Sequence, residues 1–297
     1  MTTFVVAPGQ GAQSQGFLAP WLDQVEGFRS LLESYSSYAG IDLIDLGTNA
    51  SEETIRDTAV AQPLIVAASL ASYRTMPSLS IDGVAGHSVG EFAAAAVAGV
   101  LTDEESMRLV SVRAQSMARA AARVDTGMAA VIGGEPSAVQ KALEDLDLSG
   151  ANHNGAGQLV AAGLKANIMQ LISNPPEKAR VIELKVAGAF HTSFMQEAQN
   201  ELRQHADSIS PSDPSMPLWS NQAGQLVQSG REFLDLLVHQ VANPVRWDLV
   251  MENFVGQDAA IIELAPAGAL SGLLKRAVED CRTVPLRSPQ DFERVTQ

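Results

Sequence analysis

The feature that most constrains the fold is the pentapeptide Gly86-His87-Ser88-Val89-Gly90, which stands between a strand pattern and a helix pattern. Residues 81–85 predict a short buried strand, and an Ala-rich helix is expected from Glu91. A serine on such a turn projects its hydroxyl from the edge of a sheet, and the flanking glycines relieve crowding there. The pattern therefore predicts an α/β fold with Ser88 as a nucleophile. Ser88 serving only as a helix cap is the alternative.

Strand and helix patterns alternate along the rest of the chain, and the order of the elements changes near residue 126. Residues 126–189 follow the order strand, helix, hairpin, helix, strand, which is the βαββαβ order of a ferredoxin-like unit. We therefore expect a small domain over 126–189, inserted into a large, discontinuous domain of residues 1–125 and 190–297. In the large domain, strands are expected at 3–7, near 218 and at 260–264, and helices at 102–123, 193–209, 232–241, after 243–244 and finally from 270.

A serine nucleophile needs a base, and the chain has five histidines. His87 adjoins the serine on the turn, so its side chain should point away. His205 and His239 lie in helical patterns that favour surface or structural roles, and His153 in the hairpin is undecided. His191 follows an apolar strand at the return to the large domain, where loops line the cleft between domains. His191 is therefore the candidate base.

One arginine of the helix expected at 102–123 lies close to the apolar face. At about 100° per residue, Arg113 falls about 70° from the centre of the apolar stripe, whereas Arg108 and Arg119 lie on the opposite side. Arg113 could extend its head to water or pair with a core carboxylate. Alternatively, a guanidinium at the floor of a cleft can bind a substrate carboxylate through two parallel hydrogen bonds.

Composition limits the class of protein. The chain has 20 basic and 34 acidic residues, a formal charge of −14, so nucleic acid is not expected as a partner. The longest apolar stretch, residues 92–101, is too short to span a bilayer, and the first residues lack the basic segment of a signal peptide. Cys281 is the single cysteine. We therefore expect a cytoplasmic enzyme without a membrane partner or disulfide.

Taken together, the motifs resemble those of malonyl-CoA:acyl carrier protein transacylases and the acyltransferase domains of fatty acid and polyketide synthases. The resemblance covers residues 4 to about 284. The motifs that carry it are Gly9-Gln10-Gly11-Ala12-Gln13, Gly86-His87-Ser88-Val89-Gly90-Glu91, Arg113, Gly188-Ala189-Phe190-His191 and Asn243-Pro244-Val245-Arg246-Trp247.

The resemblance implies an α/β-hydrolase-like large domain with an inserted ferredoxin-like small domain and an active site between them. It implies a Ser88–His191 dyad whose histidine is oriented by a backbone carbonyl, that of Gln240. The N–H groups of Gln10 and Val89 would form the oxyanion hole. As a dinucleotide loop, the glycines around Gln10 lack the third glycine of that fingerprint.

The resemblance also implies the ligands. Arg113 would bind the malonyl carboxylate, Asn152 and Asn154 would border the pocket, and Phe190 matches a position linked to malonyl rather than methylmalonyl choice. Malonyl-CoA and an acyl carrier protein would be the partners, with no metal and no cofactor apart from the coenzyme A thioester as substrate. A serine esterase or thioesterase, or a catalytically silent scaffold, is the alternative.

Overall fold

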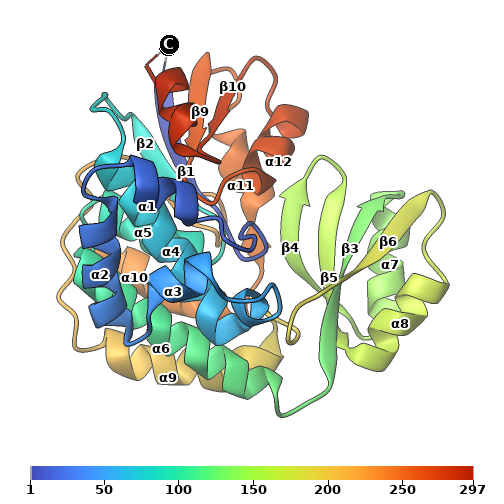
Figure 1. Ribbon diagram of the computed structural model, residues 1–297. Helices are drawn as coiled ribbons and strands as arrows, with labels where there is room; N and C mark the ends of the chain where they lie inside the picture. Colours follow the sequence, from blue (N-terminus) through green and yellow to red (C-terminus); the bar gives the residue numbers. More distant parts are fainter. Residues whose placement is uncertain (1, 297) are drawn as a thin grey trace.

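Five parallel strands form the sheet at whose edge the predicted nucleophile lies, in a computed structural model that describes residues 2–296 (Figure 1). Their spatial order is β10 (Arg282–Pro285), β9 (Ala259–Glu263), β1 (Thr2–Ala7), β2 (Gly83–Gly86) and β7 (Leu218–Trp219). Because β1 and β2 are parallel neighbours, their carboxyl ends lie side by side, with Ala7 in register with Gly86. A ligand site is expected at the carboxyl edge of such a sheet.

Helices cover both faces of this sheet. Those that precede the second sheet are α1 (Ala19–Gln24), α2 (Phe28–Ala39), α3 (Leu43–Thr48), α4 (Thr58–Thr75), α5 (Gly90–Val97) and α6 (Asp103–Ala121), with the 3₁₀ turn η1 (Thr54–Arg56). Those that follow it are α9 (Gln196–Ala206), α10 (Gly230–His239), α11 (Trp247–Glu252) and α12 (Ala269–Ala277), with η2 (Ser193–Met195), η3 (Gln240–Ala242) and η4 (Pro289–Arg294).

The second sheet has the expected ferredoxin-like order and one additional strand. Its spatial order is β6 (Ala179–Leu184), β3 (Thr126–Gly133), β5 (Gln158–Leu164), β4 (Ser149–Gly155) and β8 (Val245–Arg246). The helices α7 (Pro136–Asp145) and α8 (Lys165–Ser173) cover its outer face (Figure 1). Because β8 comes from beyond residue 190, the second sheet is completed by a segment outside 126–189. The proposed domain limits themselves stay a prediction.

The alternation of β1 shows how the parallel sheet is buried on both faces. Val5 and Ala7 join a core that includes α2, α4, α5 and α6, whereas Phe4 and Val6 join a second core with Trp219 and α11. Successive strand residues point to opposite faces, so a continuous apolar run indicates a sheet covered on both sides. A third core lies between the second sheet and its two helices.

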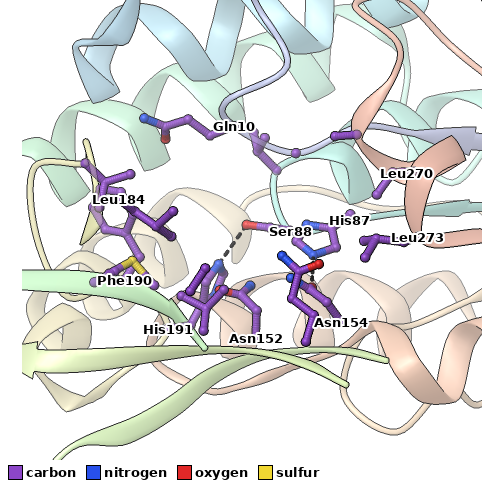
Figure 2. Close-up of a pocket in the computed structure, with 18 of the residues that line it drawn as sticks. Gln10, His87, Ser88, Asn152, Asn154, Leu184, Phe190, His191, Leu270 and Leu273 are labelled. Atoms are coloured by element: carbon purple, nitrogen blue, oxygen red, sulfur yellow. Dashed lines mark hydrogen bonds between the residues drawn. The ribbon is translucent and has the colours of Figure 1, made fainter. Parts of the chain in front are cut away.

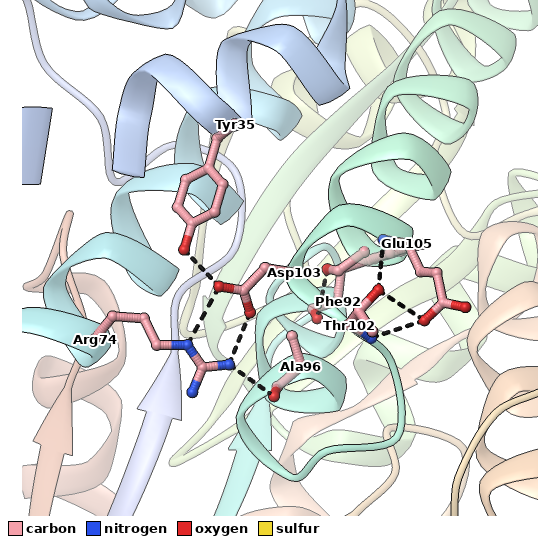
Figure 3. Close-up of polar contacts among 8 residues, drawn as sticks. Tyr35, Arg74, Phe92, Ala96, Thr102, Asp103 and Glu105 are labelled. Carbon is pink, nitrogen blue, oxygen red and sulfur yellow. Dashed lines mark hydrogen bonds and ion pairs between the residues drawn. The ribbon is translucent and has the colours of Figure 1, made fainter. Parts of the chain in front are cut away.

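At one end of α4 and α6, a polar cluster joins four helices (Figure 3). Arg74 of α4 donates to both carboxylate oxygens of Asp103 in α6, with distances of 2.7 and 3.2 Å, and to the carbonyl of Ala96 in α5 at 3.1 Å. The Tyr35 hydroxyl of α2 donates to the same carboxylate at 2.6 Å. We call these three side chains, Tyr35, Arg74 and Asp103, the Asp103 cluster.

Three expectations for the elements need correction. The helix from residue 270 is not the last element, because β10 and η4 follow it; β10 contains Pro285 and is only four residues long, so its pattern is weak. The segment 193–209 is a 3₁₀ turn followed by a helix that ends at Ala206. Strand β2 begins at Gly83, two residues later than expected. Among the described residues, no helix is long and apolar enough to cross a membrane.

Candidate active site

Ser88 sits on a sharp turn between β2 and α5. Its φ of 52° is in the left-handed region, which a non-glycine residue adopts only where its surroundings enforce it. A Cβ at Gly86 would lie 2.1 Å from the carbonyl carbon of Gly90, and one at Gly90 would lie 2.2 Å from the carbonyl oxygen of Ala7. Both flanking positions therefore require glycine, which is the steric signature of a nucleophile elbow.

A buried asparagine holds this turn in place. The side chain of Asn221 accepts the N–H of Ser88 at 2.7 Å and donates to the carbonyl of Gly86 at 2.7 Å. Asn221 is fully buried and follows β7, the strand adjacent to β2. The neighbouring strand thus satisfies the two backbone groups that the strained turn would otherwise leave without partners.

His191 lies within hydrogen-bond distance of the candidate nucleophile. Its Nε2 is 2.7 Å from the Ser88 Oγ (Figure 2). Its Nδ1 is 2.7 Å from the backbone carbonyl of Gln240. His191 also has a positive φ of 60°. The Thr192 hydroxyl, which donates to the carbonyl of Ala189 at 2.6 Å, supports this tight loop.

The hydrogen bonds fix the protonation of His191. A carbonyl oxygen only accepts, so Nδ1 carries the proton and Nε2 presents its lone pair to the serine hydroxyl. Burial, followed by the positive charge of Arg113, lowers the pKa of His191 to about 3. The imidazole is therefore neutral at physiological pH and can accept the serine proton, as general-base catalysis requires.

Arg113 is 1% exposed and directs its guanidinium toward the dyad. Nη1 donates to the Gln62 side chain at 2.5 Å, and Nη2 donates to the Gln240 side chain at 2.8 Å and contacts the Ser88 Oγ at 3.3 Å. The Arg113 Nε has no partner among residues 2–296. The central carbon of the guanidinium, Cζ, lies 5.8 Å from the centre of the Phe92 ring. Burial lowers the pKa of Arg113. A guanidinium held by neutral amides remains available to a carboxylate.

These groups share one cavity of about 490 Å³ between the two sheets. Ser88 enters from one side, and the side chains of the second sheet and of the loop at His191 enter from the other (Figure 2). The large-domain side also supplies Leu270 and Leu273 of α12, and the second sheet supplies Met128, Ala130, Val160 and Leu184. The cavity combines a few polar groups, among them Ser88, His191 and Arg113, with apolar side chains, as small-molecule sites usually do.

The remaining expected site residues also line this cavity. The backbone N–H groups of Gln10 and Val89 have no protein acceptor in the described part of the chain, so both are free to bind an oxyanion. Asn152 and Phe190 are buried in the wall, at 7% and 6% exposure. The side chain of Asn154 is engaged by the protein itself, because its Oδ1 lies 3.0 Å from His87 Nε2. His87 thus points away from Ser88, as expected.

Three buried polar residues at the site have no assigned role from the sequence. Gln62 is a single amide within the apolar run of α4, and this is the one local feature of the sequence that could have marked it as a site residue. Asn221 follows a strand whose neighbour carries Ser88, but the pairing of β2 with β7 joins residues more than 130 positions apart. Glu91 is part of the motif around Ser88, and its carboxylate reaches Asn221 and Gln240.

Comparisons with known proteins agree with this geometry. The family model described as the acyl transferase domain matches residues 3–294. The malonyl CoA-acyl carrier protein transacylase of Mycobacterium tuberculosis is 45% identical over 97% of each chain. A crystal structure of the transacylase from the same organism covers 100% of both chains with a TM-score of 0.95 and 43% identity.

A second solved structure shows a malonyl-transacylase in complex with its type II PKS acyl-carrier protein. It covers 99% of this chain and 98% of its own, with a TM-score of 0.92 and 28% identity. The match of the family model to almost the whole chain, and the close relatives over their full length, settle the assignment. The chain belongs to the acyl transferase domain family, and within it to the malonyl-CoA:acyl carrier protein transacylases.

Proposed function

We propose that this chain transfers a malonyl group from malonyl-CoA to the phosphopantetheine thiol of an acyl carrier protein, through a malonyl ester of Ser88. The family assignment supports the reaction class. One observation carries the proposal for these residues: the Ser88 Oγ lies 2.7 Å from His191 Nε2 and 3.3 Å from Arg113 Nη2. A nucleophile, a neutral base and a carboxylate-binding cation thus meet within one small volume.

In the first step, the Ser88 Oγ attacks the thioester carbonyl and His191 Nε2 accepts the hydroxyl proton. The oxyanion of the tetrahedral intermediate binds the N–H groups of Gln10 and Val89, each contributing on the order of 10²–10³ in rate. The C–S bond then breaks, and His191 returns the proton to the coenzyme A sulfur. The second step reverses these events, with the carrier-protein thiol as nucleophile and Ser88 as leaving group.

Arg113 gives this site its preference for a dicarboxylic acyl group. The free malonyl carboxylate takes the guanidinium N–H positions that face Ser88, so the acyl group is held while the thiols exchange. Asn152 and Phe190 form the adjacent wall, and Phe190 leaves little room for an α-methyl branch. Such a methyl alters binding by only about 1–3 kcal/mol. The chemistry uses side chains, backbone N–H groups and the thioester substrate, so no resident cofactor is part of it.

We assign residues 126–189 to a small domain that supplies one wall of the cavity, and residues 1–125 and 190–297 to the catalytic domain. Arg276 of α12 reaches across between them, with Nη2 3.4 Å from the Gln158 side chain. A basic group at this rim would offset the repulsion between this chain of charge −14 and an acidic carrier protein.

Labelled malonyl-CoA, offered with and without a carrier protein, tests the proposal against its alternatives. Label found on Ser88 and then on the carrier thiol supports transfer. Rapid release of free malonate without thiol transfer indicates a thioesterase, and absence of label on the protein indicates a scaffold. In the Ser88→Ala variant the acyl adduct should disappear from the mass spectrum; an adduct that persists would reassign the nucleophile.

A further inference from the structure

One buried ionisable group at the site, Glu91, has no role in the transfer mechanism proposed above. Glu91 lies in the first turn of α5, three residues after the nucleophile, and is 1% exposed. One carboxylate oxygen accepts the backbone N–H of Asn221 at 2.7 Å, and the other accepts the side-chain N–H of Gln240. A buried carboxylate is costly, so its retention next to the dyad calls for a physical reason.

The contacts of Gln240 supply that reason, because this residue bonds to Glu91 and also to Ser88, His191 and Arg113. Its backbone carbonyl accepts the proton of His191 Nδ1 at 2.7 Å. Its side-chain oxygen accepts from Arg113 Nη2 at 2.8 Å. Its side-chain nitrogen donates to the carbonyl of Ser88 at 3.0 Å and to Glu91.

A glutamine amide has an oxygen and a nitrogen of nearly the same shape, so its orientation depends on its neighbours. A carboxylate only accepts hydrogen bonds and a guanidinium only donates them. Because Glu91 binds the nitrogen end, the oxygen end of Gln240 must face Arg113. The orientation of one amide thus connects a carboxylate and a guanidinium that form no direct ion pair among residues 2–296.

Charge reinforces this arrangement. Burial raises the pKa of Glu91 to about 8, although the two donors at its oxygens and the charge of Arg113 act in the opposite direction. Both oxygens accept N–H groups, from Asn221 and from Gln240, and this geometry favours the ionised carboxylate. Burial lowers the pKa of Arg113, and Glu91 is the charge that opposes this effect. A carboxylate one amide away therefore favours the charged guanidinium without occupying the N–H groups that face the cavity.

We infer that Glu91 is a positioning residue: acting through the Gln240 amide, it holds Arg113 charged and oriented, and leaves the cavity face of the guanidinium free for the malonyl carboxylate. This inference rests on the proposed function. A carboxylate in direct contact with Arg113 would stabilise the arginine as well, but it would compete with the substrate for the same N–H groups.

The Glu91→Gln variant tests the orientation. If the new amide keeps its oxygen on Asn221, its NH₂ group faces Gln240, whose amide must turn and present NH₂ to Arg113. The ratio of kcat/KM for malonyl-CoA to kcat/KM for acetyl-CoA should then fall on the order of 10-fold or more, mostly through KM. Equal loss for both donors would reduce Glu91 to a structural role and overturn the inference.

The exchange variant, Glu91→Gln with Gln240→Glu, keeps the same charges and places the carboxylate directly on Arg113. The amide introduced at position 91 can donate to the carboxylate introduced at position 240, but the carbonyl of Ser88 loses its side-chain donor. We therefore expect the melting temperature to recover only in part relative to Glu91→Gln, while the malonyl-to-acetyl ratio stays low. A ratio restored to wild type would show that the position of the carboxylate does not matter, and would overturn the inference. If Glu91→Gln does not fold, the malonyl-to-acetyl ratio of the exchange variant alone tests the inference.

Two controls separate the possible failures. Glu263→Gln removes another fully buried carboxylate, which accepts the N–H groups of Leu270 and Ser271 at 2.9 and 2.8 Å; it should lower the melting temperature without changing the donor ratio. Wild-type protein must form malonyl-Ser88 in the same assay. If it does not, the proposed function fails. If it does and Glu91→Gln keeps the wild-type ratio, only the inference fails.

Discussion

The helices α4 and α6 are joined twice by an arginine, and the two connections differ in kind. At one end, Arg74 of α4 binds Asp103 of α6 with two hydrogen bonds (Figure 3). Near the start of α4 and in the middle of α6, Arg113 of α6 binds the neutral side chain of Gln62 of α4. Ten residues of helix, about 15 Å, separate Asp103 from Arg113. The same pair of helices therefore contains a matched charge and an unmatched one.

The difference lies in what each arginine has left to bind. Hydrogen bonds from Arg74 to Asp103 raise the pKa of Arg74, whose donors also meet the carbonyl of Ala96. Burial lowers the pKa of Arg113, and its Nε has no acceptor in the described chain. The paired guanidinium of Arg74, which is partly exposed to solvent, stabilises the packing of the helices. An underpaired guanidinium beside a nucleophile costs stability and is available to an anionic substrate.

The largest expected effect comes from removing the unmatched charge. Arg113→Ala should lower kcat/KM for malonyl-CoA by on the order of 10²–10³, because a charge-assisted bidentate contact in a water-poor site is lost. Transfer of acetyl groups should be retained or increase. Parallel assays with both thioesters measure the change.

Arg74→Ala is the matched control and should leave the ratio of malonyl to acetyl transfer unaltered. Equal loss of both activities in Arg113→Ala would contradict the prediction, because Arg113 would then have only a structural role, like Arg74.

Breaking the matched pair should act on stability instead. Asp103→Ala leaves the Arg74 guanidinium and the Tyr35 hydroxyl without their shared acceptor. We expect a loss of about 2 kcal/mol in the free energy of unfolding, a value kept low because Arg74 and Asp103 are partly solvated. Denaturant unfolding measures it. A change in the malonyl-to-acetyl ratio larger than the change in total activity would show that Asp103 and Arg113 are coupled along α6.

The local patterns of the sequence predicted one side of this comparison and missed the other. Arg113 is identifiable because its place on the helical stripe can be computed from residue spacing alone. Ser88 is identifiable because its glycines and flanking elements are adjacent in sequence. Asp103 lies in the first turn of α6, between Thr102 and Glu105, which form a capping box. Its partners Tyr35 and Arg74 are 68 and 29 positions away, and no periodicity connects them.

The same limit applies inside the site. The orientation of His191 depends on a backbone carbonyl, and every residue has one, so only the family resemblance pointed to Gln240. The roles of Gln62, Glu91 and Asn221 depend on which elements become neighbours. The additional strand β8 has two residues, too few for any alternation to be visible. Local geometry is therefore predictable from the sequence, and long-range hydrogen-bond networks are not.

A smaller effect is expected at the edge of the Asp103 cluster. Tyr35→Phe removes one hydroxyl that donates to Asp103 at 2.6 Å and leaves the ion pair with Arg74 in place. The free energy of unfolding should fall by about 1 kcal/mol, because the acceptor is charged but partly solvated and keeps its ion pair with Arg74. Thermal or denaturant unfolding measures it. A loss as large as that in Asp103→Ala would mean that the hydroxyl, and not the arginine, is the main partner of the carboxylate.

The smallest expected effect is the absence of a titration. Burial and the charge of Arg113 lower the pKa of His191 to about 3, whereas an ordinary histidine titrates near 6.5. Between about pH 8 and pH 5, a window that lies above the lowered pKa, the imidazole should therefore stay neutral with its proton on Nδ1. The ¹⁵N chemical shifts of His191 can follow this directly.

The lowered pKa of His191 also predicts how stability depends on pH. Because the unfolded chain binds this proton more readily than the folded one, the free energy of unfolding should decline as the pH falls below about 6.5.

The matched and unmatched arginines differ again in this titration. Arg113→Ala removes the second largest of the effects that lower the His191 pKa and should move this pKa upward, whereas Arg74→Ala should leave it in place. A His191 midpoint in Arg113→Ala equal to that of the unaltered protein would mean that the unmatched arginine does not act on His191. The two arginines would then differ less than their contacts indicate.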